Sequence, residues 1–378
     1  MNIKIKSYNQ YMQRIKKEKI PCYEPSVGSL EIKYLTKVIK SGWLSEKTFT
    51  RKFENFIAKF SGRKFSLSFT NATSALIVGM KALGIKKGDE VIVPSFTHSA
   101  DPNSISATGA TSVFAEVSLQ TMCLNLDSIK KVKTKKTKAI LYVAVYGNCD
   151  ELDKIEKYAK KNKIFLIIDA AAALGSIYKK KHISSYGIFS VHSFFADKTI
   201  TTGEGGMLLT DSNKILSICN LYKHDGRRER GVDKIEKAGL NCRFTELQAA
   251  VGLAQTKKLN FYIKKKKKIY ELYANEIKKF KSLKIFNYHP LCNPVPHRII
   301  VFEKNNSKNL LKYLNNNGIG VRTLFSPMHK QPAYNIKKSF SISDKLFKTG
   351  ICLPSSPRVT KRQILYICKK IKKFYEKK

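Results

Sequence analysis

Residues 188–211 read IFSVHSFFADKTITTGEGGMLLTD, and this stretch indicates the fold more clearly than any other. An apolar run of strand length, residues 188–195, is followed by Lys198 in a turn rich in glycine and threonine, and then by the apolar run GGMLLTD. Apolar runs without polar alternation are typical of strands covered on both faces in an α/β sheet. We therefore expect two buried strands joined by a loop that carries Lys198.

Five more runs of this kind precede residue 188. They are KFSLSF (64–69), EVIVP (90–94), TSVFAEV (111–117), AILYVAVY (139–146) and IFLIIDA (164–170). Helices fit between them, for example over Ser74 to Leu83 and over Asp150 to Asn162. The sequence thus predicts an α/β fold with a large doubly wound domain, residues 45–255, around a mostly parallel seven-stranded sheet.

The remaining chain has a different texture, which predicts a smaller α+β domain formed by residues 1–44 and 256–378. Residues 246–280 indicate one long helix or a pair of helices with a lysine-covered outer face. Shorter strand-like and helical pieces follow, namely HRIIVFE (297–303), KNLLKYLNNNG (308–318), GVRTLF (320–325) and TKRQILYICKKIKKFY (360–375). The first forty or so residues are expected to be helical and to pack with this domain.

Length and composition place the chain among globular proteins with more than one lobe. Its 378 residues exceed the ~250–300 at which single cores stop growing, and 43% hydrophobic with 26% charged residues is ordinary. No apolar run approaches the ~20 residues that span a bilayer, and the stretch MNIKIKSYNQYMQRIKKEK lacks the apolar block of a secretory signal. We expect a cytoplasmic location and no membrane partner.

The eight cysteines are scattered, without a Cys-x-x-Cys pair and without a histidine at zinc spacing. Neither a disulfide framework nor a metal site is indicated, so we expect reduced and mostly buried thiols. The net charge of +43 has two interpretations. It could attract a nucleic acid or a membrane surface, or lysine could simply fill exposed positions. The second is favoured, because the lysines run along the whole chain and arginine, the forked donor for bases and phosphates, is scarce. No specific nucleic-acid partner is expected.

Three features stand where strands end, the place at which open α/β sheets bind ligands. After KFSLSF, residues 70–74 (TNATS) begin a helix whose free N–H groups suit a phosphate, although Thr or Ser there can be a plain cap. After IFLII, Asp169 precedes four alanines that leave room for a flat ring, although it too could be a helix cap. After IFSVHSFF, Lys198 can be desolvated into a usable nucleophile, whereas most lysines are solvated. Together these are the parts that pyridoxal 5′-phosphate (PLP) requires.

The chain resembles the DegT/DnrJ/EryC1/StrS family of sugar aminotransferases over nearly its whole length. The matching stretches are SGWLSEKTFTRKFENFIAKFSGRKFSLSFTNATSAL, GIKKGDEVIVPSFTHSADPNSI, TKAILYVAVYGN, IIDAAAALGS, SFFADKTITTGEGGMLLTD, GLNCRFTELQAAVGLAQ, VRTLFSPMHKQPAY and ICLPSSP. The resemblance implies PLP fold type I. It implies that Lys198 forms the Schiff base with PLP and moves the proton, and that Asp169 holds the pyridinium nitrogen. Ala72, Thr73 and Ser193 would bind the cofactor phosphate.

The resemblance also implies a homodimer with shared active sites, because Asn241 would reach the phosphate of the neighbouring subunit's cofactor. His98 occupies the position of an aromatic residue that stacks on the pyridine ring. The chain departs from the family at Ala144, where a histidine is frequent, at Ala172, where a polar residue is common, and at Asp197, where asparagine is usual. The loss of one such contact should weaken cofactor binding or tuning without abolishing the chemistry, because the lysine, the acid for the pyridinium nitrogen and the phosphate site are all present.

The resemblance implies transfer of an amino group from an amino acid, commonly glutamate, to a keto-sugar nucleotide, in surface-polysaccharide or glycan biosynthesis. The stretches DKTITTGEGGM, VRTLFSPMH and LPSSP are most similar to enzymes that aminate C4 of a 4-keto-6-deoxyhexose, the perosamine-synthase type. Amination of a 3-keto sugar stays an alternative. The 3-dehydratase branch replaces the lysine with histidine, which the intact Lys198 opposes. A basic regulator of nucleic acid without enzymatic activity is the alternative from another class, but no nucleic-acid-binding motif is present.

Overall fold

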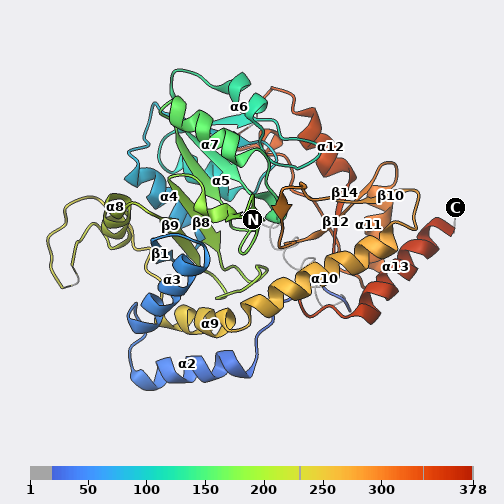
Figure 1. Ribbon diagram of the computed structural model, residues 1–378, viewed down its shortest axis with the longest axis horizontal. Helices are drawn as coiled ribbons and strands as arrows, with labels where there is room; N and C mark the ends of the chain where they lie inside the picture. Colours follow the sequence, from blue (N-terminus) through green and yellow to red (C-terminus); the bar gives the residue numbers. More distant parts are fainter. Residues whose placement is uncertain (1–18, 230, 335, 377–378) are drawn as a thin grey trace, which may run out of the picture.

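The large domain of the computed structural model is built on a seven-stranded sheet (Figure 1), and residues 19–229, 231–334 and 336–376 are described. The strand order is β1–β9–β8–β5–β4–β2–β3. The strands are β1 (Phe65–Phe69), β2 (Glu90–Pro94), β3 (Thr111–Ala115), β4 (Thr137–Val143), β5 (Phe165–Asp169), β8 (Phe189–Ser193) and β9 (Gly206–Thr210). All seven apolar runs are therefore strands of one sheet, as expected. Strand β9 is antiparallel to both neighbours, whereas β3, β2, β4, β5 and β8 pair in parallel.

The central strands lack polar alternation because both faces of the sheet are covered. Ile140 and Ile168 belong to the hydrophobic core on one face, and Leu141 and Ile167 belong to the core on the other. All four side chains are fully buried. Since successive side chains of a strand point to opposite faces, an unbroken apolar run is what such a sheet requires.

Helices cover the sheet and begin at caps that the sequence supplies. Helix α4 begins at Ala72, slightly before the expected start at Ser74. Asn71 is its cap and accepts a hydrogen bond from the Ser74 N–H at 2.8 Å. Thr245 caps α9 together with Gln248 in a reciprocal capping box. The helices of this domain are α3 (Thr48–Phe60), α4 (Ala72–Ala82), α5 (Ala100–Ser106), α6 (Leu126–Val132), α7 (Leu152–Lys161), α8 (Asn213–Lys223) and α9 (Glu246–Thr256).

The smaller domain contains the antiparallel sheet β10–β12–β14–β13. Its elements are α10 (Leu259–Ile277), β10 (Leu283–Ile285), β12 (Ile299–Glu303), α11 (Ser307–Asn316), β13 (Arg322–Thr323), α12 (Ser341–Thr349), β14 (Gly350–Leu353) and α13 (Lys361–Glu376). The lysine-rich stretch is thus a pair of helices, α9 and α10. In Figure 1, α10 runs from α9 to the small domain. The expected strand in residues 320–325 shrinks to the short edge strand β13.

The N-terminal segment contacts both parts of the molecule. Ile20 pairs with Ile319 of the small domain, whereas helix α2 (Ser29–Ser41) packs along α9 (Figure 1). Residues 1–18, which belong to the expected helical region, lie outside the described residues, and residues 21–28 form no helix. The division of the chain at residues 44 and 255 stays a prediction.

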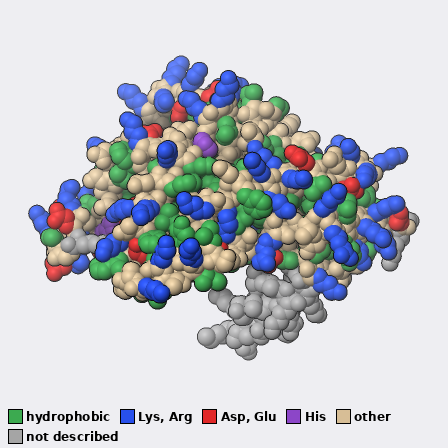
Figure 2. Space-filling model, turned by 60° about the horizontal axis from the view of Figure 1, so that its bottom comes forward, with side chains coloured by type: hydrophobic (Ala, Val, Ile, Leu, Met, Phe, Trp, Pro, Cys, Tyr) green, Lys and Arg blue, Asp and Glu red, His purple; other side chains and the backbone are tan. Residues whose placement is uncertain are grey.

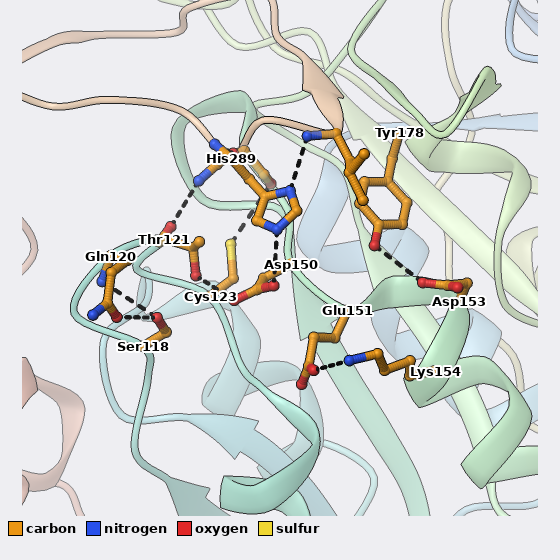
Figure 3. A network of polar contacts seen from close by, with 12 residues as sticks. Ser118, Gln120, Thr121, Cys123, Asp150, Glu151, Asp153, Lys154, Tyr178 and His289 are labelled. Atoms are coloured by element: carbon orange, nitrogen blue, oxygen red, sulfur yellow. Dashed lines mark hydrogen bonds and ion pairs between the residues drawn. The ribbon is translucent and has the colours of Figure 1, made fainter.

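A polar network fixes the segment before β11 (Cys292–Asn293) against the large domain (Figure 3). The Nε2 atom of His289 lies 3.5 Å from Asp150 Oδ1, while Asp150 Oδ2 accepts a hydrogen bond from Thr121 Oγ1 at 3.0 Å. The backbone N–H of His289 donates to Asn148 Oδ1 at 3.2 Å. These contacts join the segment to the loops that follow β3 and β4 at the carboxyl ends of the large sheet.

Three expectations concern the molecule as a whole. All eight cysteines lie in the described part of the chain, where each is buried and free, so the expectation of buried thiols is confirmed. No helix among the described residues is long and apolar enough to cross a membrane. Figure 2 shows lysine and arginine side chains spread over the visible face instead of gathered over one element.

Candidate active site

A cavity of about 750 Å³ lies at the carboxyl ends of the large sheet, between the two domains. The segments that follow β1, β2, β4, β5 and β8 line one side of it, with residues such as Thr73, His98, Ala144, Asp169 and Lys198. The small domain and the N-terminal segment line the other side, with Tyr23, His297, Arg298, Arg322 and Phe325. This is the edge of the sheet where ligands are expected to bind.

The first turn of α4 forms a cradle for an anion. Asn71 Oδ1 accepts the Ser74 N–H, whereas the N–H groups of Ala72 and Thr73 have no acceptor within the helix because they belong to its first turn, and they stay available at its positive end. Ser193, the last residue of β8, lines the same cavity. A phosphate needs this set of N–H and O–H donors.

Gly206 lets strand β9 pass directly behind this cradle. A Cβ atom at Gly206 would lie 2.3 Å from the carbonyl carbon of Asn71 and 2.4 Å from the nitrogen of Ala72. Any side chain would therefore push the first turn of α4 out of place. This close approach holds the N–H groups of Ala72 and Thr73 against strand β9. The residues present therefore fit a bound phosphate.

Asp169 places a carboxylate at the mouth of β5. Its side chain is buried, and Oδ1 accepts the backbone N–H of Ala171 at 2.7 Å. Ala171 and Ala172 continue the cavity wall with methyl groups only. A flat ring can lie against these methyls with a protonated nitrogen directed at Asp169, as the residue types suggest.

Lys198 stands in a loop that hydrogen bonds hold closed. The N–H of Thr202 and the hydroxyl of Thr201 both donate to the carbonyl of Phe194, at 2.9 and 3.0 Å. The Lys198 side chain is 19% exposed, and its Nζ lies 3.6 Å from Asp197 Oδ1. The amine is thus in the wall of the cavity, not in bulk solvent.

Asp197, one of the departures from the family, has a second partner in Arg298, whose guanidinium donates to Asp197 Oδ2. Burial would raise the pKa of Asp197, but the charges of Lys198 and Arg298 hold it below its ordinary value. Arg298 also lies over the ring of Tyr23 at 4.8 Å, as does Arg322 from β13. The far wall of the cavity therefore carries two guanidinium groups around one aromatic ring.

His98 lines the cavity next to Phe325, with the two rings edge to face and their centroids 5.9 Å apart. Its Nδ1 accepts the N–H of Ala100 at 3.1 Å. Partial burial lowers the pKa of His98, and the charge of Lys198 lowers it further. A neutral imidazole ring can lie against a cofactor ring as an aromatic side chain would.

Lys266 of α10 lies behind the cavity wall and was not expected from the sequence. Among the described residues, its Nζ reaches only carbonyl oxygens, those of Pro296 at 3.3 Å and His297 at 3.4 Å. Burial lowers the pKa of Lys266 to about 7, the nearby Arg298 acts in the same direction, and Asp197 opposes it.

The structure gathers most of the expected site residues around one cavity. Those that line it are Ala72, Thr73, His98, Asp169, Ser193 and Lys198. Asn241 is different, because it is exposed in the segment before α9, pairs with His224 in a β-bridge and does not line the cavity of its own chain. In a single chain, Asn241 is thus free to face another subunit.

Sequence reasoning missed the residues that enter the site from outside the large sheet. Tyr23 precedes the first described helix, and Arg298 and Arg322 come from the small domain. It also missed Asp101, a fully buried acid in α5. The sequence offers no clear signal for Asp101, because the stretch around it, PSFTHSADPNSI, mixes small polar and apolar residues.

Comparisons with known proteins agree with this geometry. The DegT/DnrJ/EryC1/StrS aminotransferase family matches residues 25–372. GDP-perosamine synthases from Escherichia coli O157:H7 and Vibrio cholerae are both 35% identical, covering 95% and 94% of this chain and 99% of each relative. The structure of Helicobacter pylori PseC, an aminotransferase involved in pseudoaminic acid biosynthesis, superimposes with a TM-score of 0.89 at 25% identity, over 95% of this chain and all of that one. The expected fold is thereby confirmed.

Proposed function

The chain belongs to the DegT/DnrJ/EryC1/StrS aminotransferase family and is a PLP-dependent aminotransferase, and we propose that its amino acceptor is the keto group of a nucleotide-linked sugar. The proposal is carried by one observation: Lys198 and Asp169 face a single cavity whose opposite wall presents Arg298 and Arg322. One side of the cavity suits the cofactor, and the other suits a second, anionic ligand.

The residues of the large domain fit PLP, and we assign them as follows. The N–H groups of Ala72 and Thr73, with the Ser193 hydroxyl, would bind the phosphate, and Asp169 would hold the pyridinium nitrogen. When bound, PLP supplies an electron sink that makes the proton on the amine-bearing carbon removable. Lys198, fixed by its closed loop, is the base that would take this proton and return it.

The acceptor fits the remainder of the cavity. A volume of about 750 Å³ is in the upper range for small-molecule sites and accommodates a ligand larger than an amino acid. A nucleotide sugar carries a diphosphate, and a single guanidinium group can donate hydrogen bonds to two phosphate oxygens at once. The large positive charge of the chain, +43, would add long-range attraction for such a substrate.

Within this class we favour C4 of a 4-keto-6-deoxyhexose. The support is the similarity to two GDP-perosamine synthases over nearly the whole chain, together with the stretches DKTITTGEGGM and LPSSP. A role in surface-polysaccharide or glycan synthesis would follow, and one relative at 31% identity, from Bacillus subtilis, is a spore coat polysaccharide biosynthesis protein. Glutamate is the proposed amino donor, and a homodimer is the proposed working unit.

The test is amination of a panel of GDP-, UDP- and dTDP-linked sugars that carry a ketone at C4 or at C3, with glutamate as donor. We expect turnover of a 4-keto substrate, with the new amine located by NMR of the product. Lys198→Ala is the matched control and should abolish turnover while the protein stays folded. Preference for a 3-keto sugar would refute the regiochemistry, and activity on simple keto acids alone would refute the sugar acceptor.

Two measurements distinguish this proposal from a basic regulator of nucleic acid: the colour of the purified protein and the salt dependence of its DNA binding. The purified enzyme should be yellow from its bound cofactor. Its binding to duplex DNA should be weak, insensitive to sequence and lost at moderate salt, as counterion release requires. A colourless protein with tight, sequence-selective DNA binding at physiological salt would favour the regulator.

A further inference from the structure

A second carboxyl group lies behind Asp169. Asp101, in the first turn of α5, is fully buried, and its carboxyl group is within hydrogen-bonding reach of the Asp169 carboxyl. The Thr97 hydroxyl donates to Asp101 Oδ2. The other oxygen, Asp101 Oδ1, is buried and accepts no hydrogen bond from any described residue.

Two buried carboxyls within hydrogen-bonding reach of each other cannot both be ionised at low cost. Like charges in a shared buried site oppose each other, and a carboxylate oxygen without a donor keeps its full desolvation penalty. A single proton removes both problems, because a protonated carboxyl donates to its neighbour. That proton belongs on Asp101, since Asp169 already accepts the N–H of Ala171 and lines the cavity, whereas Asp101 has no exposed surface.

We propose that Asp101 is a positioning residue that stays protonated in the folded enzyme and donates a hydrogen bond to Asp169, which keeps the Asp169 carboxyl group directed into the cavity. This inference rests on the proposed role of Asp169 toward the cofactor nitrogen. Burial raises the pKa of Asp101 well above its ordinary value, and the charge of Asp169 raises it further. The Thr97 hydroxyl and Lys198 act in the opposite direction, and His98 and Asp197 are further titratable groups next to Lys198.

Two substitutions of Asp101 distinguish the effect of its hydrogen-bond donor from the effect of its size. Asp101→Asn keeps the size and a permanent N–H donor, whereas Asp101→Leu keeps the branched shape and removes the donor. We expect PLP affinity of the Asn variant within about threefold of the wild type. We expect the Leu variant to bind PLP about tenfold more weakly or worse, since a hydrogen bond to a charged group is lost.

The protonation itself can be read without turnover. Infrared spectroscopy of the full-length protein, with and without PLP, should show the C=O stretch of a protonated carboxyl at neutral pH, and this band should be missing from both variants. In the wild type, PLP affinity should fall as rising pH ionises Asp101. In the Asn variant, that loss should be absent.

Three results would overturn the proposal. They are the absence of a neutral-pH carboxyl band that disappears with Asp101, an Asn variant that binds PLP as weakly as the Leu variant, and identical pH profiles for Asn variant and wild type. If the Leu variant does not fold, the infrared band and the two pH profiles still decide. If all three proteins fail to aminate nucleotide sugars while these readouts hold, the proposed acceptor is wrong and the carboxyl pair stands.

Discussion

Asp197 and Arg298, from opposite domains, form a buried ion pair in the wall of the active-site cavity, with side chains only 13% and 9% exposed. This pair gives a physical reason for one departure from the family. An asparagine at position 197 would leave the guanidinium of Arg298 without a carboxylate, and a buried unpaired charge is costly. Asp197 is therefore matched to Arg298 within this chain.

We predict that Asp197→Asn and Arg298→Met are each strongly destabilising and that the double variant recovers most of the loss. Breaking a buried pair by removing one partner costs about 3–5 kcal/mol, while replacing both partners is often nearly neutral. Chemical unfolding of the four proteins measures the coupling as a double-mutant cycle. Additive losses would show that the two side chains do not stabilise each other.

Gly206→Ala should weaken cofactor binding by about tenfold or more, because the added methyl collides with the backbone of Asn71 and Ala72. Equilibrium titration with PLP measures the effect. Gly28→Ala is the matched control, since a Cβ there meets no atom within 4 Å. Unchanged PLP affinity in the Gly206 variant would show that the cradle does not need its present position.

A shared active site predicts complementation between two inactive variants. Asn241 is exposed and does not line the cavity of its own chain, so in the proposed dimer it serves the partner. When Lys198→Ala and Asn241→Asp subunits exchange, one site of each mixed dimer collects both defects and the other collects none. Activity should return in proportion to the mixed dimer. If exchange is verified and activity does not return, Asn241 has a structural role only.

Glu46 should contribute stability that is lost in acid. Burial alone would raise its pKa, but the hydrogen bond from His224 and the charge of Lys223 lower it to about 2. A carboxyl with a lowered pKa stabilises the fold fully above its ordinary value of 4.5 and loses this contribution as the pH falls toward 2.

Glu46→Gln should therefore lower the free energy of unfolding at neutral pH by about 3 kcal/mol, since Lys223 is left buried beside a neutral amide. The difference from the wild type should shrink between pH 4.5 and 2. Glu276→Gln, which breaks the exposed pair with Lys279, is the control and should change stability by less than about 1 kcal/mol. A constant difference across this pH range would contradict the assignment.

The sequence was sufficient to predict the large domain, because strands buried on both faces leave an unmistakable apolar pattern. The fold-type-I architecture, with all seven strands, is confirmed. The strand ends also pointed to Lys198 and Asp169, since ligands of such sheets bind there. The roles of these residues and of Asn241 stay predictions.

What the sequence could not reveal depends on contacts between distant segments. Arg298 becomes a site residue only because the small domain brings it to Asp197. Tyr23 becomes one only because the N-terminal segment places its ring against Arg298. Asp101 gives no periodic signal, because its partner Asp169 comes from another strand end. Strand β13 is limited to Arg322 and Thr323, which are exposed at the edge of their sheet, and the apolar residues around them in 320–325 did not reveal this limit.

The pairing of β1 with β9 determines when the phosphate cradle can be completed during synthesis of the chain. The first turn of α4 follows β1, which ends at Phe69, yet the glycine that fixes this turn opens β9 at position 206. The ribosome therefore synthesises the first turn of α4 long before strand β9, which lies behind it. Arg298 and Arg322, on the opposite wall of the cavity, are synthesised later still. Capture of the vitamin-derived cofactor becomes a late event in biosynthesis. We expect chains that end before residue 206 to bind the cofactor poorly, because the strand behind the first turn of α4 is missing from them.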